Sequence, residues 1–161
     1  MQKYDQATIT AFGYGKDNAY KNNPDGGDRV ARTRDPKRNY GHAAHAVLGS
    51  GVFHYPTSMS VKPDSGIPFG SMVYVYGMGW FVVEDVMAGG FAGPRFDMWS
   101  GPSESLEMRV LSGKMDVVVY SNPGNIPSDL RALGPSPTWT AHFNKMRERI
   151  RIQKLNLFVS P

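Results

Sequence analysis

The sequence predicts a single, mainly β domain built around a small barrel. Its 161 residues are the length of one domain and suffice for a buried core. The 18 Gly and 12 Pro interrupt helices too often for a long helical bundle. Short runs of β-branched and aromatic residues lie between turn residues, which favours a barrel over an α/β sheet. We expect the barrel core over about residues 6–121 and a C-terminal extension over about residues 122–161.

The N-terminal part predicts one strand followed by a long loop. Residues 6–15 contain ATITAFGYG, whose β-branched and aromatic side chains predict a strand. Residues 16–39 are polar and carry a basic cluster, namely Arg29, Arg32, Arg34, Lys37 and Arg38. Such a segment cannot bury itself, so we expect a long basic surface loop. Residues 42–48 predict a single helical turn or a short strand.

The middle of the chain, residues 52–120, is rich in predicted strands. Residues 71–76 and 80–84 predict a hairpin that turns at the Gly-Met-Gly segment 77–79. Residues 115–120 form a nearly continuous apolar run. Such a run is typical of a strand that is covered on both faces.

Three helices are expected in the second half of the chain. Residues 103–111 predict a short helix with Ser103 as its N-cap, and a shorter helix within the Pro- and Gly-rich segment 122–137 begins with Ser128 as its cap. Residues 138–150 predict a longer helix. Its apolar residues at helical spacing form a docking face: Trp139, Phe143, Met146 and Ile150. Its basic residues form the solvent side: Arg147, Arg149, Arg151 and Lys154. We expect a last strand at residues 155–159.

Composition excludes several classes of site. The chain has no cysteine, which excludes disulfides, thiolate zinc sites and cysteine nucleophiles. The net charge is +4, with basic flanks around a middle third (61–120) that carries seven acidic and four basic residues. This charge favours a polyanion such as nucleic acid or an anionic cell-wall polymer, or else a solvated surface.

Two carboxylic acids carry the strongest chemical signal. Asp85 ends an apolar strand and precedes the glycine-bearing loop MAGGFAG, and Asp97 follows twelve residues later between Phe96 and Met98. A carboxyl group among apolar residues loses hydration, so its pKa rises, and a second carboxylate nearby raises it further. A protonated carboxyl beside a glycine-rich loop is suited to protonating a glycosidic oxygen.

The run IPFGSMVYVYGMGWFVVEDVMAGGFAGPRFDMWSG resembles the three-aspartate (3D) domain of the membrane-bound lytic transglycosylase A type. That resemblance implies a six-stranded double-psi β-barrel. The matching turn residues are Ile67, Pro68 and Gly70, and the matching loop residues are Gly89, Gly90 and Gly93. Asp85 matches the aspartate that opens the loop, and Asp97 matches the aspartate of the hydrophobic-Asp-hydrophobic-aromatic element. The family's Asp-Pro pair is reversed here as Pro63-Asp64, and the loop is one residue longer.

The resemblance implies a peptidoglycan lytic transglycosylase in which Asp97 is the single acid and base. The product would be a 1,6-anhydro-muramoyl sugar, and Asp85 would help to set the protonation of Asp97. We expect further substrate contacts from Tyr14, Lys62, Asp64, Gly89, Gly90, Arg95, Trp99 and Ser100. Trp99 is expected either to stack on a sugar ring or to pack in the core, and Trp80 to pack in the core. No cofactor and no metal are expected.

Two other functions remain open at this point. A glycoside hydrolase on the same barrel would use two carboxyl groups, with Asp17 as a further candidate base. A non-catalytic glycan-binding module would not need Asp97. Nucleic-acid binding is disfavoured because no recognition motif is present. His42, His45 and His54 with Asp64 lack the spacing of a metal site, so surface or core histidines are the favoured interpretation.

The expected partner is peptidoglycan or a related polysaccharide, and the expected state is a monomer. No apolar run approaches ~20 residues, so no membrane span is expected. The N-terminus has no apolar signal core. We therefore expect an extracytoplasmic protein that is trimmed, or one delivered by a phage particle or a secretion system.

Overall fold

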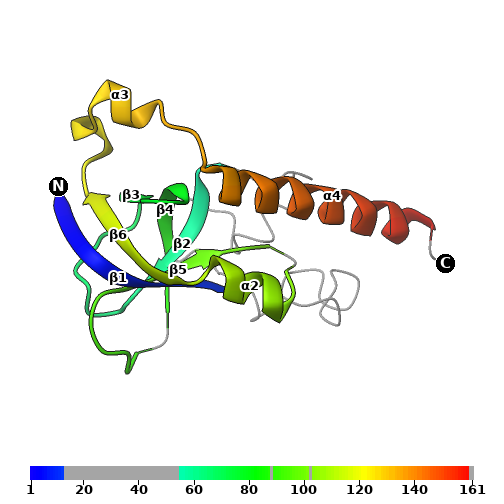
Figure 1. The fold of residues 1–161 in the computed structure, drawn as a ribbon, viewed down its shortest axis with the longest axis horizontal. Coiled ribbons are helices and arrows are strands. Elements are labelled where there is room, and N and C mark those ends of the chain that lie inside the picture. Colours follow the sequence, from blue (N-terminus) through cyan, green and yellow to red (C-terminus); the bar gives the residue numbers. More distant parts are fainter. Residues whose placement is uncertain (13–54, 88, 102, 160–161) are drawn as a thin grey trace.

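The computed structural model describes residues 1–12, 55–87, 89–101 and 103–159, and Figure 1 shows a β-barrel from which one long helix extends. The strands are β1 (Gln2–Phe12), β2 (Thr57–Val61), β3 (Met72–Val75), β4 (Gly79–Val86), β5 (Arg95–Trp99) and β6 (Gly113–Tyr120). The helices are α2 (Ser105–Leu111), the short 3-10 helix η4 (Pro123–Asn125), α3 (Ser128–Arg131) and α4 (Pro137–Val159).

The six strands close into a barrel in the order β1-β5-β2-β4-β3-β6. The pairs β1/β5 and β2/β4 are parallel, and the other pairs are antiparallel. The predicted small barrel is thus confirmed, as is the hairpin of β3 and β4. The predicted loop 16–39 and the segment 42–48 lie outside the described residues.

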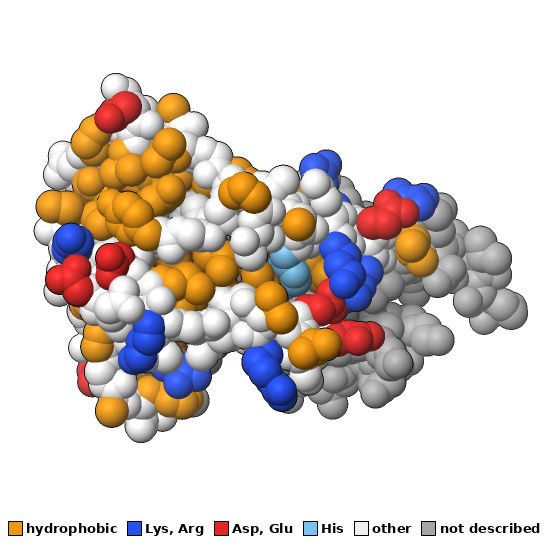
Figure 2. All heavy atoms as spheres, viewed as in Figure 1, with side chains coloured by type: hydrophobic (Ala, Val, Ile, Leu, Met, Phe, Trp, Pro, Cys, Tyr) orange, Lys and Arg blue, Asp and Glu red, His pale blue; other side chains and the backbone are white. Residues whose placement is uncertain are grey.

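The barrel interior is filled by apolar side chains that alternate along each strand, as a half-buried strand requires. Large, fully buried members include Ile9, Met59, Phe81, Phe96 and Met98. A second apolar cluster lies on the outer face of β3, β4 and β6 and contains Trp80, Val118, Tyr120 and Ile126. In Figure 2 hydrophobic side chains gather near α3, whereas charged side chains of both signs mix between the barrel and α4.

The first strand begins earlier than expected, at Gln2 instead of residue 6. The first residues of β1 lack the regular alternation of apolar and polar side chains that predicts a strand. A bulge between Tyr4 and Ala7 breaks the alternation of inward and outward residues there. Gln6 lies at the bulge with a φ of 51°. Asp116 on β6 accepts hydrogen bonds from the Gln6 backbone N–H at 2.9 Å and from its side-chain amide at 3.1 Å, which stabilises this bend.

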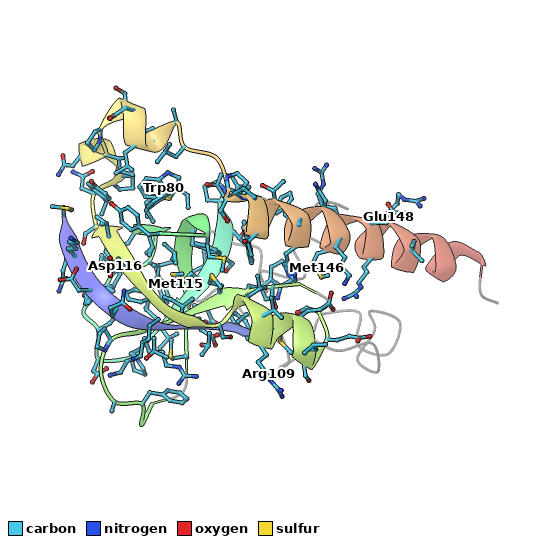
Figure 3. All side chains as sticks on the ribbon, in the orientation of Figure 1. Trp80, Arg109, Met115, Asp116, Met146 and Glu148 are labelled. Carbon is cyan, nitrogen blue, oxygen red and sulfur yellow. The ribbon has the colours of Figure 1, made fainter. Side chains whose placement is uncertain are left out.

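Helix α4 docks on the barrel through the predicted apolar face. Trp139 and Met146 are fully buried, and Phe143 packs against the same core. Figure 3 shows Met146 on the side of α4 that faces the barrel and α2, and Glu148 on the opposite side. The imidazole Nε2 of His142 lies 2.8 Å from the backbone oxygen of Ser100, so it also holds the helix to the end of β5.

The predicted last strand at residues 155–159 is wrong, because these residues form the final turns of α4. Residues 147–157 are mostly good helix formers, which extends the helix once the first turns have docked. A closed barrel also offers no free strand edge to which a further strand could pair. No helix in the described part of the chain is long and apolar enough to cross a membrane.

Both predicted N-caps are also corrected. The N-cap of α2 is Glu104, which forms a reciprocal capping box with Glu107. Ser103 is buried instead, with its hydroxyl 2.6 Å from that of Ser100. In α3 the cap position is Pro127, and Ser128 is the first helical residue.

Glu107 joins α2 to α4 as well as closing the capping box. Its carboxylate lies 2.7 Å from the Lys145 ammonium and 2.5 Å from the Arg149 guanidinium. Partial burial acts to raise the pKa of Glu107, but the hydrogen bonds from Arg149 and Lys145 outweigh it and lower the pKa to about 2. This ionic contact therefore stabilises the docked helix at neutral pH.

We expect Glu107→Gln to lower the free energy of unfolding at pH 7 by about 1–3 kcal/mol, because two cations lose their partner. A carboxylate with a lowered pKa stabilises the fold above pH 4.5, its ordinary pKa, and loses this effect as pH falls toward 2. Urea unfolding at several pH values should therefore show the difference shrinking between pH 5 and pH 2. Glu148→Gln is the control, since its pair with Arg151 is exposed and should contribute little to stability. An unchanged stability of Glu107→Gln at pH 7 would contradict the assignment.

Candidate active site

Four polar residues form one row across neighbouring strands on the outside of the barrel. Asp97 on β5 lies opposite Thr10 on β1 and opposite Ser60 on β2. Ser60 in turn lies opposite Asp85 on β4. Neighbouring strands are about 4.8 Å apart, so the two aspartates, separated by β2, have Cα atoms about 9–10 Å apart. The barrel thus brings together the two carboxyl groups that the sequence singled out.

A bulge in β4 turns Asp85 toward this row. Phe81 and Val83 point into the barrel, so strict alternation would also point Asp85 inward. The pairing of β2 with β4 shifts by one residue after Met59, however, and Glu84 becomes the extra residue of β4. The shift places Asp85 on the same face as Ser60, whose hydroxyl donates to Asp85 Oδ2 at 3.1 Å.

Asp97 has the electrostatic setting of a proton donor. Burial raises the pKa of its carboxyl most strongly, and the negative charge of Asp85 raises it further. The hydrogen bond from the Thr10 hydroxyl to Asp97 Oδ1, at 2.8 Å, and the positive charge of Arg95 act in the opposite direction. The net pKa lies above the ordinary value, as the sequence predicted from the apolar neighbours of Asp97.

A second, basic row lies beside the carboxyl row. Arg95 precedes Asp97 by two residues on β5 and lies opposite Thr8 on β1, which lies opposite Lys114 on β6. Lys62 follows the end of β2 and donates from Nζ to the Gly93 backbone oxygen at 3.0 Å. Two residues along a strand span about 6.6 Å, which is about the length of an extended Arg or Lys side chain. The cations of this basic row therefore lie within one side-chain length of the carboxyl row.

The loop between β4 and β5 contains the predicted glycines in an open setting. Gly89, Gly90 and Gly93 are exposed. Gly90 and Gly93 have φ values of 92° and 69°, which side chains with a Cβ rarely adopt. No heavy atom lies within 4 Å of a Cβ built at any of the three, so backbone conformation, not crowding, is what favours glycine at positions 90 and 93.

Two of the expected substrate residues, Trp99 and Ser100, lie in the core, which for Trp99 is the second of the two roles left open above. Trp99 is 1% exposed and belongs to the main apolar cluster, so its ring has no free face for a sugar. Ser100 is fully buried, and its hydroxyl donates to the Phe12 backbone oxygen at 2.9 Å. Trp80 packs in the second cluster, as expected, and donates from Nε1 to the Leu130 backbone oxygen at 3.0 Å. Alternation along β5 places Trp99 on the same face as Asp97, and the sequence does not show that the end of this strand is covered.

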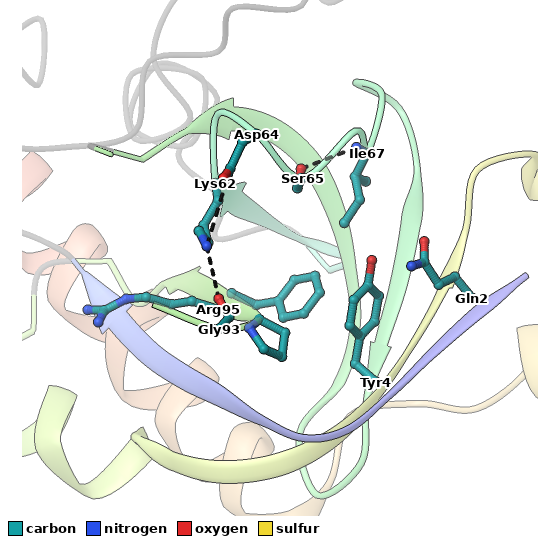
Figure 4. A pocket seen from close by; sticks show the side chains of 10 residues that line it. Gln2, Tyr4, Lys62, Asp64, Ser65, Ile67, Gly93 and Arg95 are labelled. Carbon is teal, nitrogen blue, oxygen red and sulfur yellow. Dashed lines mark hydrogen bonds and ion pairs between the residues drawn. The ribbon is translucent and has the colours of Figure 1, made fainter. Parts of the chain in front are cut away.

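A pocket of about 420 Å³ lies at the barrel end where β1 and β5 begin and β2 ends (Figure 4). Its lining includes the expected residues Lys62, Asp64 and Arg95. Asp85, Asp97 and the two loop glycines Gly89 and Gly90 are not part of this lining. Asp64 is exposed, and its carboxylate lies 3.8 Å from the Lys62 ammonium.

Sequence reasoning missed several residues that complete the site. Thr10 and Ser60 were unremarkable hydroxyls until the register placed them beside the two aspartates. Gln2 and Tyr4 line the pocket but precede the strand that the sequence predicted. The alternation Thr8-Ile9-Thr10 was the one available signal in the sequence, because it predicts which residues lie on the same face of the strand as Thr10.

Several residues singled out from the sequence are not among the described residues. Tyr14, Asp17, His42, His45 and His54 lie outside the described residues. Within the part of the chain that the structure describes, no group of three or more His, Cys, Asp or Glu side chains is placed to hold a metal ion.

We expect the pKa of Asp97 to move in opposite directions in two variants. Asp85→Asn removes a negative charge and should lower it, whereas Thr10→Val removes a hydrogen bond to the carboxylate and should raise it. Carboxyl 13C NMR titration measures both shifts, with Asp129→Asn on α3 as a remote control. The row is wrongly assigned if Asp85→Asn leaves the titration of Asp97 unchanged.

In comparisons with known proteins, no family model matches this chain, no curated protein matches it, and no solved structure matches it.

Proposed function

We propose that this chain cleaves glycans by general acid catalysis at Asp97, as a peptidoglycan lytic transglycosylase. The observation that carries the proposal is the raised pKa of Asp97 in a row with Asp85. A carboxyl that keeps its proton toward neutral pH can protonate a leaving-group oxygen. The resemblance of residues 67–101 to the three-aspartate domain supplies the choice of substrate.

The two oxygens of Asp97 have different surroundings. The Thr10 hydroxyl donates to Oδ1, so this oxygen acts as an acceptor. Oδ2 then carries the proton of the neutral acid, because a carboxylic acid holds its proton on one oxygen. The hydrogen bond from Thr10 also fixes the orientation of the carboxyl group, which is the condition for directed proton transfer.

In the proposed reaction, Asp97 donates its proton to the oxygen between N-acetylmuramic acid and N-acetylglucosamine. The bond from C1 of the muramic acid to that oxygen breaks, and the leaving sugar departs with a new hydroxyl group. The 6-hydroxyl oxygen of the same muramic acid then bonds to C1, and its proton returns to the Asp97 carboxylate. The ring closes to a 1,6-anhydro sugar without the addition of water.

The setting of Asp85 favours one catalytic acid over a pair. Asp85 is 8% exposed and accepts a hydrogen bond from Ser60, with strand β2 between it and Asp97. A hydrolase would need a second carboxyl that reaches a water or the sugar. Asp85 instead acts on Asp97 through its charge, as a positioning and pKa-setting residue.

The finer topology is part of the same proposal. We propose that the barrel has the double-psi arrangement of the three-aspartate domain. The closed six-stranded barrel with two parallel pairs supports it.

Asp97→Asn should abolish glycan cleavage while binding and fold remain, because the amide cannot donate an acidic proton. Purified peptidoglycan is digested with the wild type, with Asp97→Asn, and with Asp129→Asn as a matched carboxyl-to-amide control. Mass spectrometry should find anhydro-muropeptides with the wild type and the control only. Products heavier by one water would replace the proposal with a hydrolase. No products from the wild type, with the protein still bound to the wall, would replace it with a glycan-binding module.

The same variant should not lose stability at neutral pH. A carboxyl whose folded pKa is raised stabilises the fold below its ordinary pKa, and this effect is lost as pH rises through the raised value. Asp97→Asn should therefore have a Tm at pH 7 equal to or above that of the wild type, and the advantage should disappear at pH 3. Thermal unfolding followed by circular dichroism measures both. A clearly lower Tm at pH 7 would mean that the carboxylate itself is needed for folding.

A further inference from the structure

The pocket at the barrel end has the size of a ligand site. Its volume of about 420 Å³ lies within the range of small-molecule pockets, ~300–1,000 Å³. Phe96, Pro94 and Ile67 give it an apolar floor and wall, and Tyr4 packs edge-on against Phe96 with ring centroids 5.3 Å apart. Mouths of β-barrels are frequent places for such sites.

The charges in the lining are largely compensated. The Lys62 ammonium lies 3.8 Å from the Asp64 carboxylate and also donates to the Gly93 backbone oxygen. The Arg95 guanidinium lies 3.8 Å from the centroid of the Phe91 ring, and Figure 4 shows it directed away from Tyr4. The lining thus carries one compensated pair, Lys62 and Asp64, and one cation, Arg95, whose guanidinium does not face the polar side chain of Tyr4.

Two polar side chains of the pocket have no hydrogen-bond partner among the residues that the structure describes. The Tyr4 hydroxyl and the Gln2 amide make no hydrogen bond to the described residues, and Figure 4 shows both beside the space in front of Ile67. Ser65 uses its oxygen to accept from the Ile67 backbone N–H at 3.2 Å, so its own proton remains to be donated. Donors and acceptors thus surround an apolar floor.

We infer that this pocket binds one uncharged sugar ring. The apolar face of a pyranose would lie on Ile67 and Pro94, and its hydroxyl groups would bond to Tyr4, Gln2 and the Lys62–Asp64 pair. A ring with several hydroxyls requires this mixture of donors and acceptors, whereas an acidic ligand would require uncompensated cations.

The place of the pocket gives the bound ring a role in the proposed function, on which this part of the inference rests. Arg95 lines the pocket and precedes Asp97 by two residues, which is about 6.6 Å along the strand. A glycan held in the pocket would thus lie one to two sugar units from the acid. Gln2 and Tyr4 would be positioning residues, which hold the chain and do not touch the bond that breaks.

The test is direct binding of neutral and acidic oligosaccharides by isothermal titration calorimetry. The probes are the tetramer of N-acetylglucosamine, cellotetraose, and the tetramer of galacturonic acid. All proteins carry Asp97→Asn so that no probe is cleaved. We add Tyr4→Phe or Gln2→Ala, which remove unpartnered polar groups and leave the packing of Tyr4 on Phe96 in place. Tyr76→Phe, directly after the end of β3, is the matched control, because this tyrosine is exposed and does not line the pocket.

A neutral tetramer should bind, and each pocket variant should weaken it about 3- to 10-fold, as the loss of one hydrogen bond implies. The control should leave the affinity unchanged. Binding of the galacturonic acid probe alone, or equal binding by the Asp97→Asn protein with and without each pocket substitution, would overturn the inference. A comparison of the two neutral probes shows whether the acetamido group is recognised.

This result is separable from the fate of the proposed function. Neutral binding that is weakened by Tyr4→Phe supports the pocket even if the wild type releases no peptidoglycan fragments. Conversely, cleavage by the wild type with no effect of the pocket variants on binding would overturn the pocket and leave the acid at Asp97 in place. In an active enzyme, Tyr4→Phe should raise KM and leave kcat within about twofold, since it removes binding and not chemistry.

Discussion

Strand β2 sets the geometry on which the site depends. Ser60 lies opposite Asp97 on one side and opposite Asp85 on the other, so a single strand holds the two carboxyl groups at a fixed separation. The charge of Asp85 acts on Asp97, while each carboxyl group accepts a hydrogen bond from a different hydroxyl, Thr10 for Asp97 and Ser60 for Asp85. The bulge at Glu84 contributes to the same arrangement of the two carboxyl groups, since without it Asp85 would face the barrel interior.

This arrangement opposes folding, and the rest of the barrel has to compensate for it. Burying a carboxyl whose pKa is raised destabilises the folded state at neutral pH. The compensation comes from the filled barrel interior and from α4, whose Trp139 and Met146 are fully buried. Glu107 ties the same helix to α2 with a carboxylate that stays ionised down to about pH 2, so this charge contact persists at low pH.

Parts of the site could be predicted because they depend only on residues that are neighbours in the sequence. Asp97 lies between apolar residues, and this alone predicts a raised pKa. The proximity of Asp85 followed from the resemblance, and the barrel register is consistent with it. Trp99 and Ser100 show the limit of such reasoning, because their exposure depends on what packs against the end of β5. Thr10 was missed as a partner of Asp97 for a related reason, since 87 residues of sequence separate the two.

The sequence by itself determined the class of fold, the hairpin of β3 and β4, and the docking face of the C-terminal helix. These features follow from residue periodicity, turn residues and helical spacing, which act over a few residues. Only the tertiary structure decided the start of β1, the bulges, the length of α4 and the pocket at the barrel end. Each of these depends on pairing between distant strands: the bulge at Gln6 requires Asp116, and Asp85 faces Ser60 only because β2 and β4 shift register. Side-chain direction reverses with a one-residue shift, so local sequence cannot predict which face a residue occupies once a bulge intervenes.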